Sequence, residues 1–272
     1  MNDSEKICLL MTATISPRNC PDAQFSPEER KRRYLTAFQY YIDRIGVAGY
    51  DYIVFVENSG VDLSDFERVI PNNVRDDVEV LSAPPGIFPV HLGKNNEFNL
   101  IDYAIDYSKK LHEEIAGFFK VTGRYYFRNI ASLLRDVRRA GMGLQLYCDQ
   151  KDHRLYSRLG IGKEESDGET RFFFSSLAFW RENFYGYFKR YPKWRRVEDI
   201  MFETAVRNYG NQNCRFRFRH QPLLGGNSFS GAQGGYIISM GIKMPPRIFF
   251  AVCHFRWLVE SALRVLLPSF WF

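Results

Sequence analysis

The chain has 272 residues, of which 45% are hydrophobic and 25% charged, and its formal net charge at pH 7 is +6. It can bury a substantial core, and without low-complexity tracts, repeats or long linkers it is expected to form one enzyme-sized domain. Its five cysteines show no paired spacing, so neither a disulfide framework nor a zinc site is indicated, and the first apolar run is too short for a signal-peptide core. We therefore expect a cytoplasmic protein with an anionic partner.

The first half of the chain alternates short apolar runs with helical patterns. Each run ends in turn-forming residues, which is typical of a buried strand. The runs lie at residues 7–11, 52–56, 78–81 and 118–121.

The clearest helix is predicted over residues 26–46. Ser26 is its expected N-cap, with Pro27 at the first helical position, Glu29 closing a capping box and Gly46 ending the helix. A second helical pattern covers residues 98–111. The alternation predicts an α/β fold, with a mostly parallel central sheet and flanking helices.

A glycine and an arginine follow the apolar run at 118–121. In open α/β sheets, ligands bind beyond the carboxyl ends of the strands. The planar fork of Arg124 suits phosphate oxygens, and Gly123 lets a ligand approach the backbone closely. The alternative is an ordinary turn with Arg124 paired to a surface carboxylate.

Arginine and phenylalanine alternate over residues 215–219, the most regular of several basic clusters. This pattern could hold nucleic acid through phosphate contacts and stacking. A half-buried strand alternates in the same way, and no nucleic-acid module accompanies the pattern, so we favour the strand and expect no nucleic-acid partner.

Two adjacent carboxylates open a predicted helix that runs from Val197 to about Asn208. Glu198 and Asp199 could simply complement the positive end of the helix dipole. One of them could instead be a general base at the edge of a pocket. The residues alone leave both roles open.

The order of these short motifs resembles bacterial GT-A-type glycosyltransferases, and more narrowly those of lipopolysaccharide and capsule biosynthesis. The resemblance covers about residues 6–240, with a separate segment at 241–272. Its motifs are Thr12-Ala13-Thr14, the VENSG sequence at 56–60, Gly93-Lys94 followed by Glu97, Thr122-Gly123-Arg124, an Arg-Phe-Phe segment at 171–173, Glu198-Asp199 and a glycine-rich stretch at 225–236.

The resemblance implies a GT-A-like, Rossmann-like fold and a nucleotide-sugar donor. It implies transfer, by an inverting mechanism, to a hydroxyl of a surface glycan or lipid-linked acceptor. Asp199, and after it Glu198, corresponds to the general base. The donor would be held by Thr12, Thr14, Glu57 and Asn58 near the nucleoside and by Lys94, Thr122, Gly123 and Arg124 near the diphosphate.

The chain departs from this family at its metal site. GT-A enzymes usually carry an Asp-x-Asp element that holds a divalent metal, and this chain has none. Either Arg124 and Lys94 take the place of Mg²⁺ or Mn²⁺, or the ligands lie elsewhere. Candidate ligands are Asp149, Asp152, Asp167 and Glu169, although the last two could belong to a solvated acidic loop.

The C-terminal residues 245–272 are apolar and aromatic but interrupted by charges, so they do not form an uninterrupted membrane-spanning run. An amphipathic helix in a membrane interface fits this pattern, as does a helix that packs on the domain. Interfacial binding would place the protein peripherally on the cytoplasmic face of the inner membrane.

Two other functions also fit parts of the sequence. A non-catalytic basic adaptor for nucleic acid or membrane would not need Lys94, Arg124 and Asp199 together. A sugar nucleotidyltransferase would be expected to carry a glycine-rich N-terminal phosphate loop followed by a lysine, and the chain has no such loop.

Overall fold

The computed structural model of the chain describes residues 6–17, 25–85, 96–113, 115–141, 143–151, 167–187, 196–225 and 246–266. Strands were expected at the four apolar runs of the first half, and each run lies in a strand. The strands are β1 (Lys6–Ala13), β2 (Tyr52–Glu57), β3 (Val78–Ser82), β4 (Ile115–Thr122), β5 (Leu146–Tyr147), β6 (Gln150–Lys151), β7 (Asp167–Gly168), β8 (Phe172–Ser175) and β9 (Cys214–Arg215).

Seven of these strands form one sheet in the order β3-β2-β1-β4-β8-β5-β9, and β6 pairs with β7 separately. The first four strands of this order run parallel, β8 is antiparallel to both its neighbours, and β9 is parallel to β5. The predicted mostly parallel α/β sheet is therefore confirmed. Parallel strands are buried on both faces, as the fully buried sequence of β2 shows.

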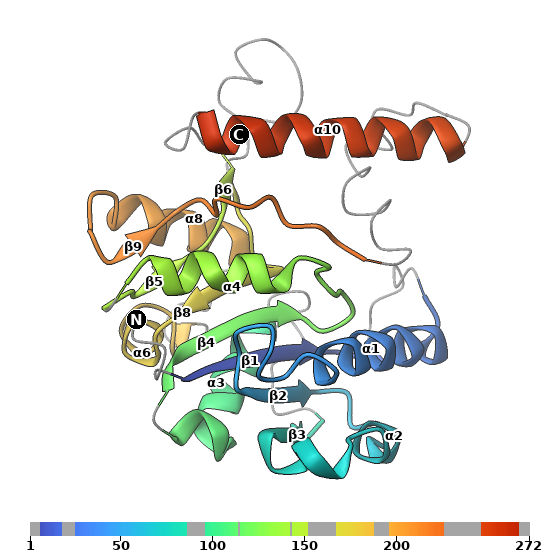
Figure 1. The fold of residues 1–272 in the computed structure, drawn as a ribbon. Helices are drawn as coiled ribbons and strands as arrows, with labels where there is room; N and C mark the ends of the chain where they lie inside the picture. The colour runs from blue at the N-terminus through green and yellow to red at the C-terminus, as the bar shows by residue number, and fades with distance from the viewer. Residues whose placement is uncertain are drawn as a thin grey trace.

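Helices cover both faces of the sheet (Figure 1). One core cluster contains Phe38 of α1 and Leu133 of α4, and the other contains Phe98 of α3, Trp180 of α6 and Ile200 of α8. The bounds are α1 (Pro27–Ile42), α2 (Ser64–Arg68), η1 (Asn72–Asp77), α3 (Asn96–Tyr107), η3 (Lys110–His112), α4 (Ile130–Arg139), α6 (Leu177–Asn183), α8 (Val197–Arg207) and α10 (Pro246–Leu266).

The start of α1 follows the predicted capping pattern in part. Ser26 accepts a hydrogen bond from the backbone of Glu29, as an N-cap does. The Glu29 carboxylate accepts from Arg32 and Arg33 on its own helix, where the capping box had it reaching back to Ser26. The helix ends at Ile42, four residues before Gly46, whose positive φ of 75° lies in the turn that follows.

The alternating arginines and phenylalanines form only a short strand, because β9 ends at Arg215. Phe218 is buried and stacks on Tyr147, with ring centroids 4.1 Å apart, while Arg215 and Arg219 are exposed. The phenylalanine therefore serves the core, in agreement with the half-buried interpretation.

Helix α10 lies across the end of the sheet that carries β5 and β9, far from β3 (Figure 1). Arg264 joins it to the body by two hydrogen bonds to Asp149, and Trp257 Nε1 donates to the Pro222 carbonyl over 3.3 Å. Packing on the domain, one of the two predicted roles of this segment, is therefore observed. The predicted boundary between residues 240 and 241 lies outside the described residues.

Within the described part of the chain, no helix has the length and apolar character needed to cross a membrane.

Candidate functional site at the carboxyl edge of the sheet

The carboxyl ends of β1 and β4 lie side by side because these strands pair in parallel. The backbone N–H of Gly123 donates to the Thr12 carbonyl over 2.8 Å. A Cβ atom at position 123 would lie only 2.9 Å from that carbonyl oxygen and 3.2 Å from Tyr34 Cδ1. Only glycine fits here without displacing a neighbour, so Gly123 allows the chain after β4 to lie close to the end of β1.

Glu97, at the start of α3, is the centre of a hydrogen-bond network at this edge. Thr12 and Thr122 donate to its Oε1 over 2.9 and 3.0 Å, and Lys120 Nζ donates to the same atom over 2.5 Å. Lys120 also donates to Thr122 Oγ1 over 3.0 Å and to the Thr170 carbonyl. We call Thr12, Glu97, Lys120 and Thr122 the Glu97 network.

Lys120 is fully buried, whereas the Glu97 side chain keeps 20% of its surface exposed. Burial lowers the pKa of Lys120, and the carboxylates of Glu97, Glu169 and Glu198 oppose this effect. A buried ammonium is tolerated because Glu97, Thr122 and Thr170 accept its hydrogen bonds. Sequence reasoning missed Lys120, although a lysine inside the apolar run FFKV was a visible signal.

Arg124 lies directly after this network. Its Nε atom is buried and has no hydrogen-bond partner among the described residues. Its guanidinium carbon lies 5.0 Å from the centre of the Tyr125 ring. Burial acts to lower the pKa of Arg124, but the phenols of Tyr125 and Tyr34 and the Glu97 carboxylate raise it above its ordinary value. The arginine is thus held as a cation with an unsatisfied donor.

The loops after β1 and β2 form the neighbouring part of the edge. Thr14 Oγ1 donates to Asn58 Oδ1 over 2.8 Å, so these two predicted donor-binding residues do meet. Glu57 is fully buried, and its carboxylate accepts backbone N–H groups of Ile15 and Ser59 over 2.9 and 2.8 Å. Its contacts shape the two loops.

The first turn of α8 holds the two candidate bases in different settings. Asp199 is ion-paired with Arg196, the N-cap residue of α8, with Nη2 2.8 Å from Oδ1, and its side chain is 36% exposed. Among the carboxylates that oppose the lowering of the Lys120 pKa by burial, Glu198 has the smallest effect, after Glu97 and Glu169. Asp199 is therefore the carboxylate of the pair whose charge a neighbouring arginine compensates.

Two of the predicted metal ligands already have cationic partners. Both oxygens of Asp149 bind the Arg264 fork, and Oδ1 also accepts the backbone N–H of Phe218 over 2.7 Å. Glu169 accepts three hydrogen bonds from Arg171. Asp167 lies in β7, where the strand register places it opposite Lys151 of β6. Within the described ranges, no group of three His, Cys, Asp or Glu side chains could hold a metal ion.

Several predicted residues cannot be placed at this edge. Lys94, Asp152 and most of the glycine-rich stretch at 225–236 lie outside the described residues. The structure thus brings together Thr12, Thr122, Gly123 and Arg124, with Thr14 and Asn58 adjoining. It adds Glu97, Lys120 and Tyr34, which the predicted set of site residues did not include.

The chain matches no protein-family model and no curated protein. Solved structures with some likeness include mouse xyloside xylosyltransferase 1, at 10% identity and a TM-score of 0.40, over 78% of this chain and 84% of that one. HddC from Yersinia pseudotuberculosis has 12% identity and a TM-score of 0.41, over 70% of this chain and 83% of its own. The WbbM bifunctional glycosyltransferase has 8% identity and a TM-score of 0.42, and the match covers 79% of this chain but 39% of WbbM.

Proposed function

We propose that this protein is a glycosyltransferase that moves a sugar from a nucleotide-sugar donor to an acceptor hydroxyl. The observation that carries the proposal is the half-buried Arg124 at the carboxyl edge of a parallel sheet, whose buried Nε has no hydrogen-bond partner among the described residues. A buried donor without a partner is costly in a folded protein, and a bound anion would satisfy it. A donor diphosphate supplies such oxygens in the geometry that an arginine fork prefers.

The Glu97 network lies at the same edge and offers polar groups that suit the uncharged part of a ligand. Glu97 keeps part of its carboxylate exposed, and the hydrogen bonds described for it all fall on Oε1. An exposed carboxylate oxygen is a suitable acceptor for ribose or sugar hydroxyls. Thr14 and Asn58 extend the polar rim, and we assign the nucleoside to this side.

The chemistry needs a proton acceptor and a cation. The acceptor hydroxyl loses its proton to a carboxylate as it attacks the anomeric carbon, and the bond to the diphosphate breaks with inversion. We place the base on the Glu198–Asp199 pair, with Glu198 first because Asp199 is ion-paired with Arg196. Arg124 stabilises the negative charge that develops on the departing diphosphate. No covalent nucleophile takes part.

Arg124 takes over the charge-stabilising role that a metal ion has in related enzymes. The described carboxylates do not fit a metal site, since Asp149 and Glu169 are each bound by an arginine. No step of the proposed reaction therefore passes through Mg²⁺ or Mn²⁺.

The acceptor class follows from the sequence resemblance. We propose a growing surface glycan, such as lipopolysaccharide, O-antigen or capsule, as the acceptor. Such acceptors are carried on lipids, so the proposed location is the cytoplasmic face of the inner membrane.

A thermal-shift screen across nucleotide sugars tests the function directly. A ligand at 100 times its Kd should add about 2.7 kcal/mol to the free energy of unfolding. With the donor that stabilises the protein most, Arg124→Lys should weaken binding about tenfold, because a point charge cannot reproduce a bidentate contact.

The exposed Arg128, four residues along the chain, offers a matched control. Arg128→Lys should bind the donor as the wild type does. A screen in which no nucleotide or nucleotide sugar stabilises the protein, or equal affinities for the wild type and Arg124→Lys, would remove the basis for the proposal.

A further inference from the structure

Helix α10 turns its polar side toward the body of the protein and its apolar side outward, the reverse of an ordinary surface helix. The side that faces the body carries Trp257, Glu260 and Arg264, which bond to Pro222, Gln221 and Asp149. The Arg264 and Asp149 side chains are 11% and 6% exposed, so this ion pair is largely sealed from water. A helix that docks on a protein core normally buries its apolar side.

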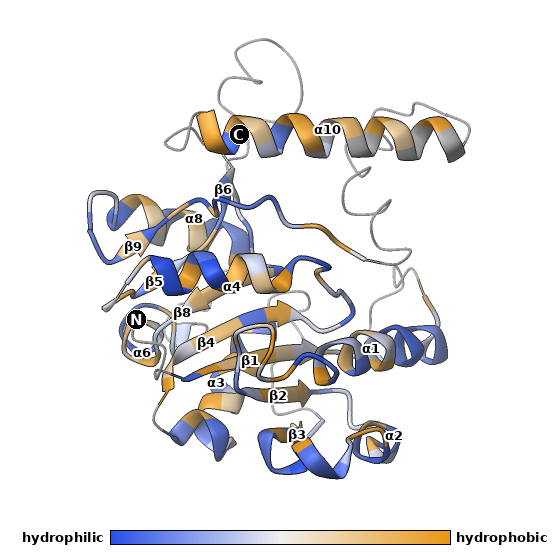
Figure 2. Cartoon of the chain, viewed as in Figure 1, coloured by the Kyte–Doolittle hydropathy of each residue, from blue (hydrophilic) through white to orange (hydrophobic). Residues whose placement is uncertain are grey.

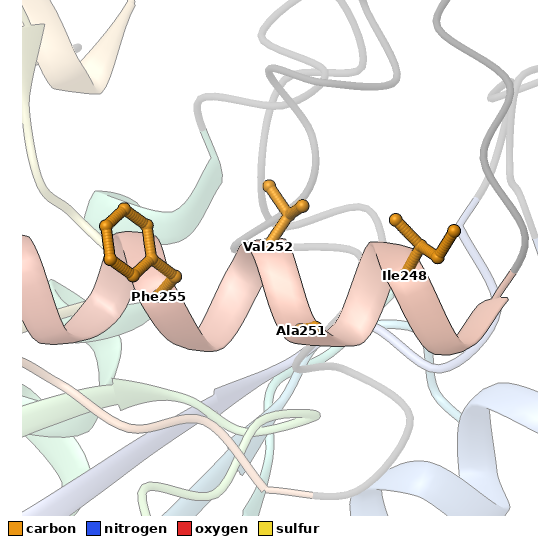
Figure 3. A pocket seen from close by; sticks show the side chains of 4 residues that line it. All are labelled: Ile248, Ala251, Val252 and Phe255. Carbon is orange, nitrogen blue, oxygen red and sulfur yellow. The ribbon is translucent and has the colours of Figure 1, made fainter.

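The opposite side of α10 is apolar and faces outward. Ile248, Phe255, Val259 and Leu266 are separated by seven, four and seven residues, which places them on one stripe of a helix. Phe255 is 69% exposed and Leu266 is 72% exposed. Ile248, Val252 and Phe255 project from the same side of the helix (Figure 3), and apolar residues extend along its length (Figure 2).

The size of this face is unusual for a surface that stays in water. The exposed side chains of Ile248, Phe255, Leu258, Val259, Val265 and Leu266 are each at least 40% accessible. They are distributed over a helix of about 32 Å, the length of 21 residues at 1.5 Å each. Contiguous apolar patches of this kind mark binding surfaces.

We propose that the apolar face of α10 binds the surface of an anionic lipid bilayer. The face is a straight strip on a single helix, which suits a planar partner. The charge of the segment also fits anionic lipid: apart from Arg264, whose charge Asp149 neutralises, α10 contains Arg247 and Arg256 against the single acid Glu260. The net charge of +6 acts in the same direction. Aromatic and aliphatic side chains combined with arginines are typical of helices that lie in a membrane interface.

The body of the protein fixes the orientation of this strip. Because Arg264 and Trp257 hold the polar side to the domain, α10 binds lipid as part of a rigid body. The inference does not depend on the reaction proposed above: lipid binding is measured without a donor or an acceptor.

Vesicle flotation of the full chain tests the proposal. The protein should float with vesicles of phosphatidylcholine and phosphatidylglycerol, and less with phosphatidylcholine alone. Phe255→Ser combined with Leu258→Ser should lower the partition coefficient about tenfold or more, since each side chain loses apolar area that the interface would bury. Added salt should weaken binding to the anionic vesicles.

A matched control replaces two exposed apolar residues on another part of the body, Val206→Ser with Tyr209→Ser, which are 49% and 68% exposed in the native protein. This variant should float like the wild type, and both variants should keep the wild-type melting temperature within a few degrees. Failure of the wild type to float, or equal losses in both variants, overturns the proposal. A dimer in light scattering that Phe255→Ser and Leu258→Ser dissociate, together with no flotation, assigns the face to a second copy of the chain instead.

Discussion

Two buried ion pairs in this protein differ in what they leave unsatisfied. In the Asp149–Arg264 pair, both carboxylate oxygens bind the arginine fork, and the Phe218 backbone also donates to one of them. In the Lys120–Glu97 pair, the ammonium is buried and fully bonded, while the hydrogen bonds to the carboxylate fall on one oxygen and the side chain stays 20% exposed. The first pair is closed and holds a helix in place. The second is open toward solvent, and beside it lies the unsatisfied Nε of Arg124.

The largest expected effect is a loss of turnover, and it tests whether catalysis takes place near the open Lys120–Glu97 pair. Glu198 is the proposed base, because the other carboxylate of the pair, Asp199, is ion-paired with Arg196. Glu198→Gln should lower turnover about 10²- to 10⁴-fold with little change in donor affinity, because the amide keeps the shape and cannot accept the proton. Turnover is measured with the donor identified by the screen and a glycan acceptor.

Asp199→Asn is the companion variant, since Asp199 is ion-paired with the N-cap residue Arg196. It should change turnover only a few fold. The reverse pattern, with Asp199→Asn inactive and Glu198→Gln active, would return the role of base to Asp199, as the sequence resemblance first placed it.

The next largest effect concerns the stability of the open pair. Lys120→Met removes a buried cation and leaves Glu97 without its strongest partner, so the free energy of unfolding should fall by about 3 kcal/mol. Chemical denaturation of both proteins measures the difference. Lys110→Met, which breaks the surface pair with Glu113 at 2.6 Å, should cost less than about 1 kcal/mol. Equal losses of unfolding free energy in the two variants would show that the Lys120–Glu97 pair stabilises the protein no more than a surface ion pair does.

A smaller and more local effect is expected from the closed pair. Arg264→Met should cost about 2 kcal/mol, less than the loss at Lys120 because α10 can leave the body without disrupting the sheet. Hydrogen exchange should then rise within α10 while the amides of β1 and β4 stay protected. Loss of protection throughout the sheet would mean that the closed pair supports the whole fold.

The smallest expected effect concerns metal ions. The carboxylates of Asp149 and Glu169 are already ion-paired with Arg264 and Arg171 and are not offered to a metal ion. A chelator should therefore change turnover less than about twofold. A complete loss with EDTA that Mn²⁺ or Mg²⁺ restores would contradict the role assigned to Arg124.

Local patterns predicted the elements of this fold well where one rule dominated. The apolar runs at β1, β2, β3 and β4 are strands, because buried parallel strands need little beyond apolar β-forming residues and a turn. The antiparallel direction of β8 was not predicted, since direction depends on which strands become neighbours, and β4 and β8 are separated by an intervening helix and the β6–β7 pair.

The sequence predicted some residues of the candidate site and missed others. Thr12 lies at the carboxyl end of β1, and Gly123 and Arg124 follow β4, so the rule for ligand sites in parallel sheets found them. Lys120 and its contact with Glu97 were missed, because a lysine within a strand is expected to face solvent and only the fold reveals its buried partners. Asp149 was predicted as a candidate metal ligand, but in the structure its carboxylate binds the guanidinium of Arg264, more than a hundred residues away in the sequence.

The antiparallel strand β8 also determines when the site can form during synthesis of the chain. Strands β1, β2, β3 and β4 are complete once residue 122 has been made, but β4 gains its second neighbour only when residues 172–175 follow. The Thr170 carbonyl that accepts a hydrogen bond from Lys120 arrives in the same late segment. Since domains begin to fold as they leave the ribosome, a nascent chain that ends near residue 150 carries an open edge on β4 and a buried lysine that lacks one acceptor. The Glu97 network, which borders the proposed donor site, is therefore completed late in synthesis, with the pairing of β4 and β8.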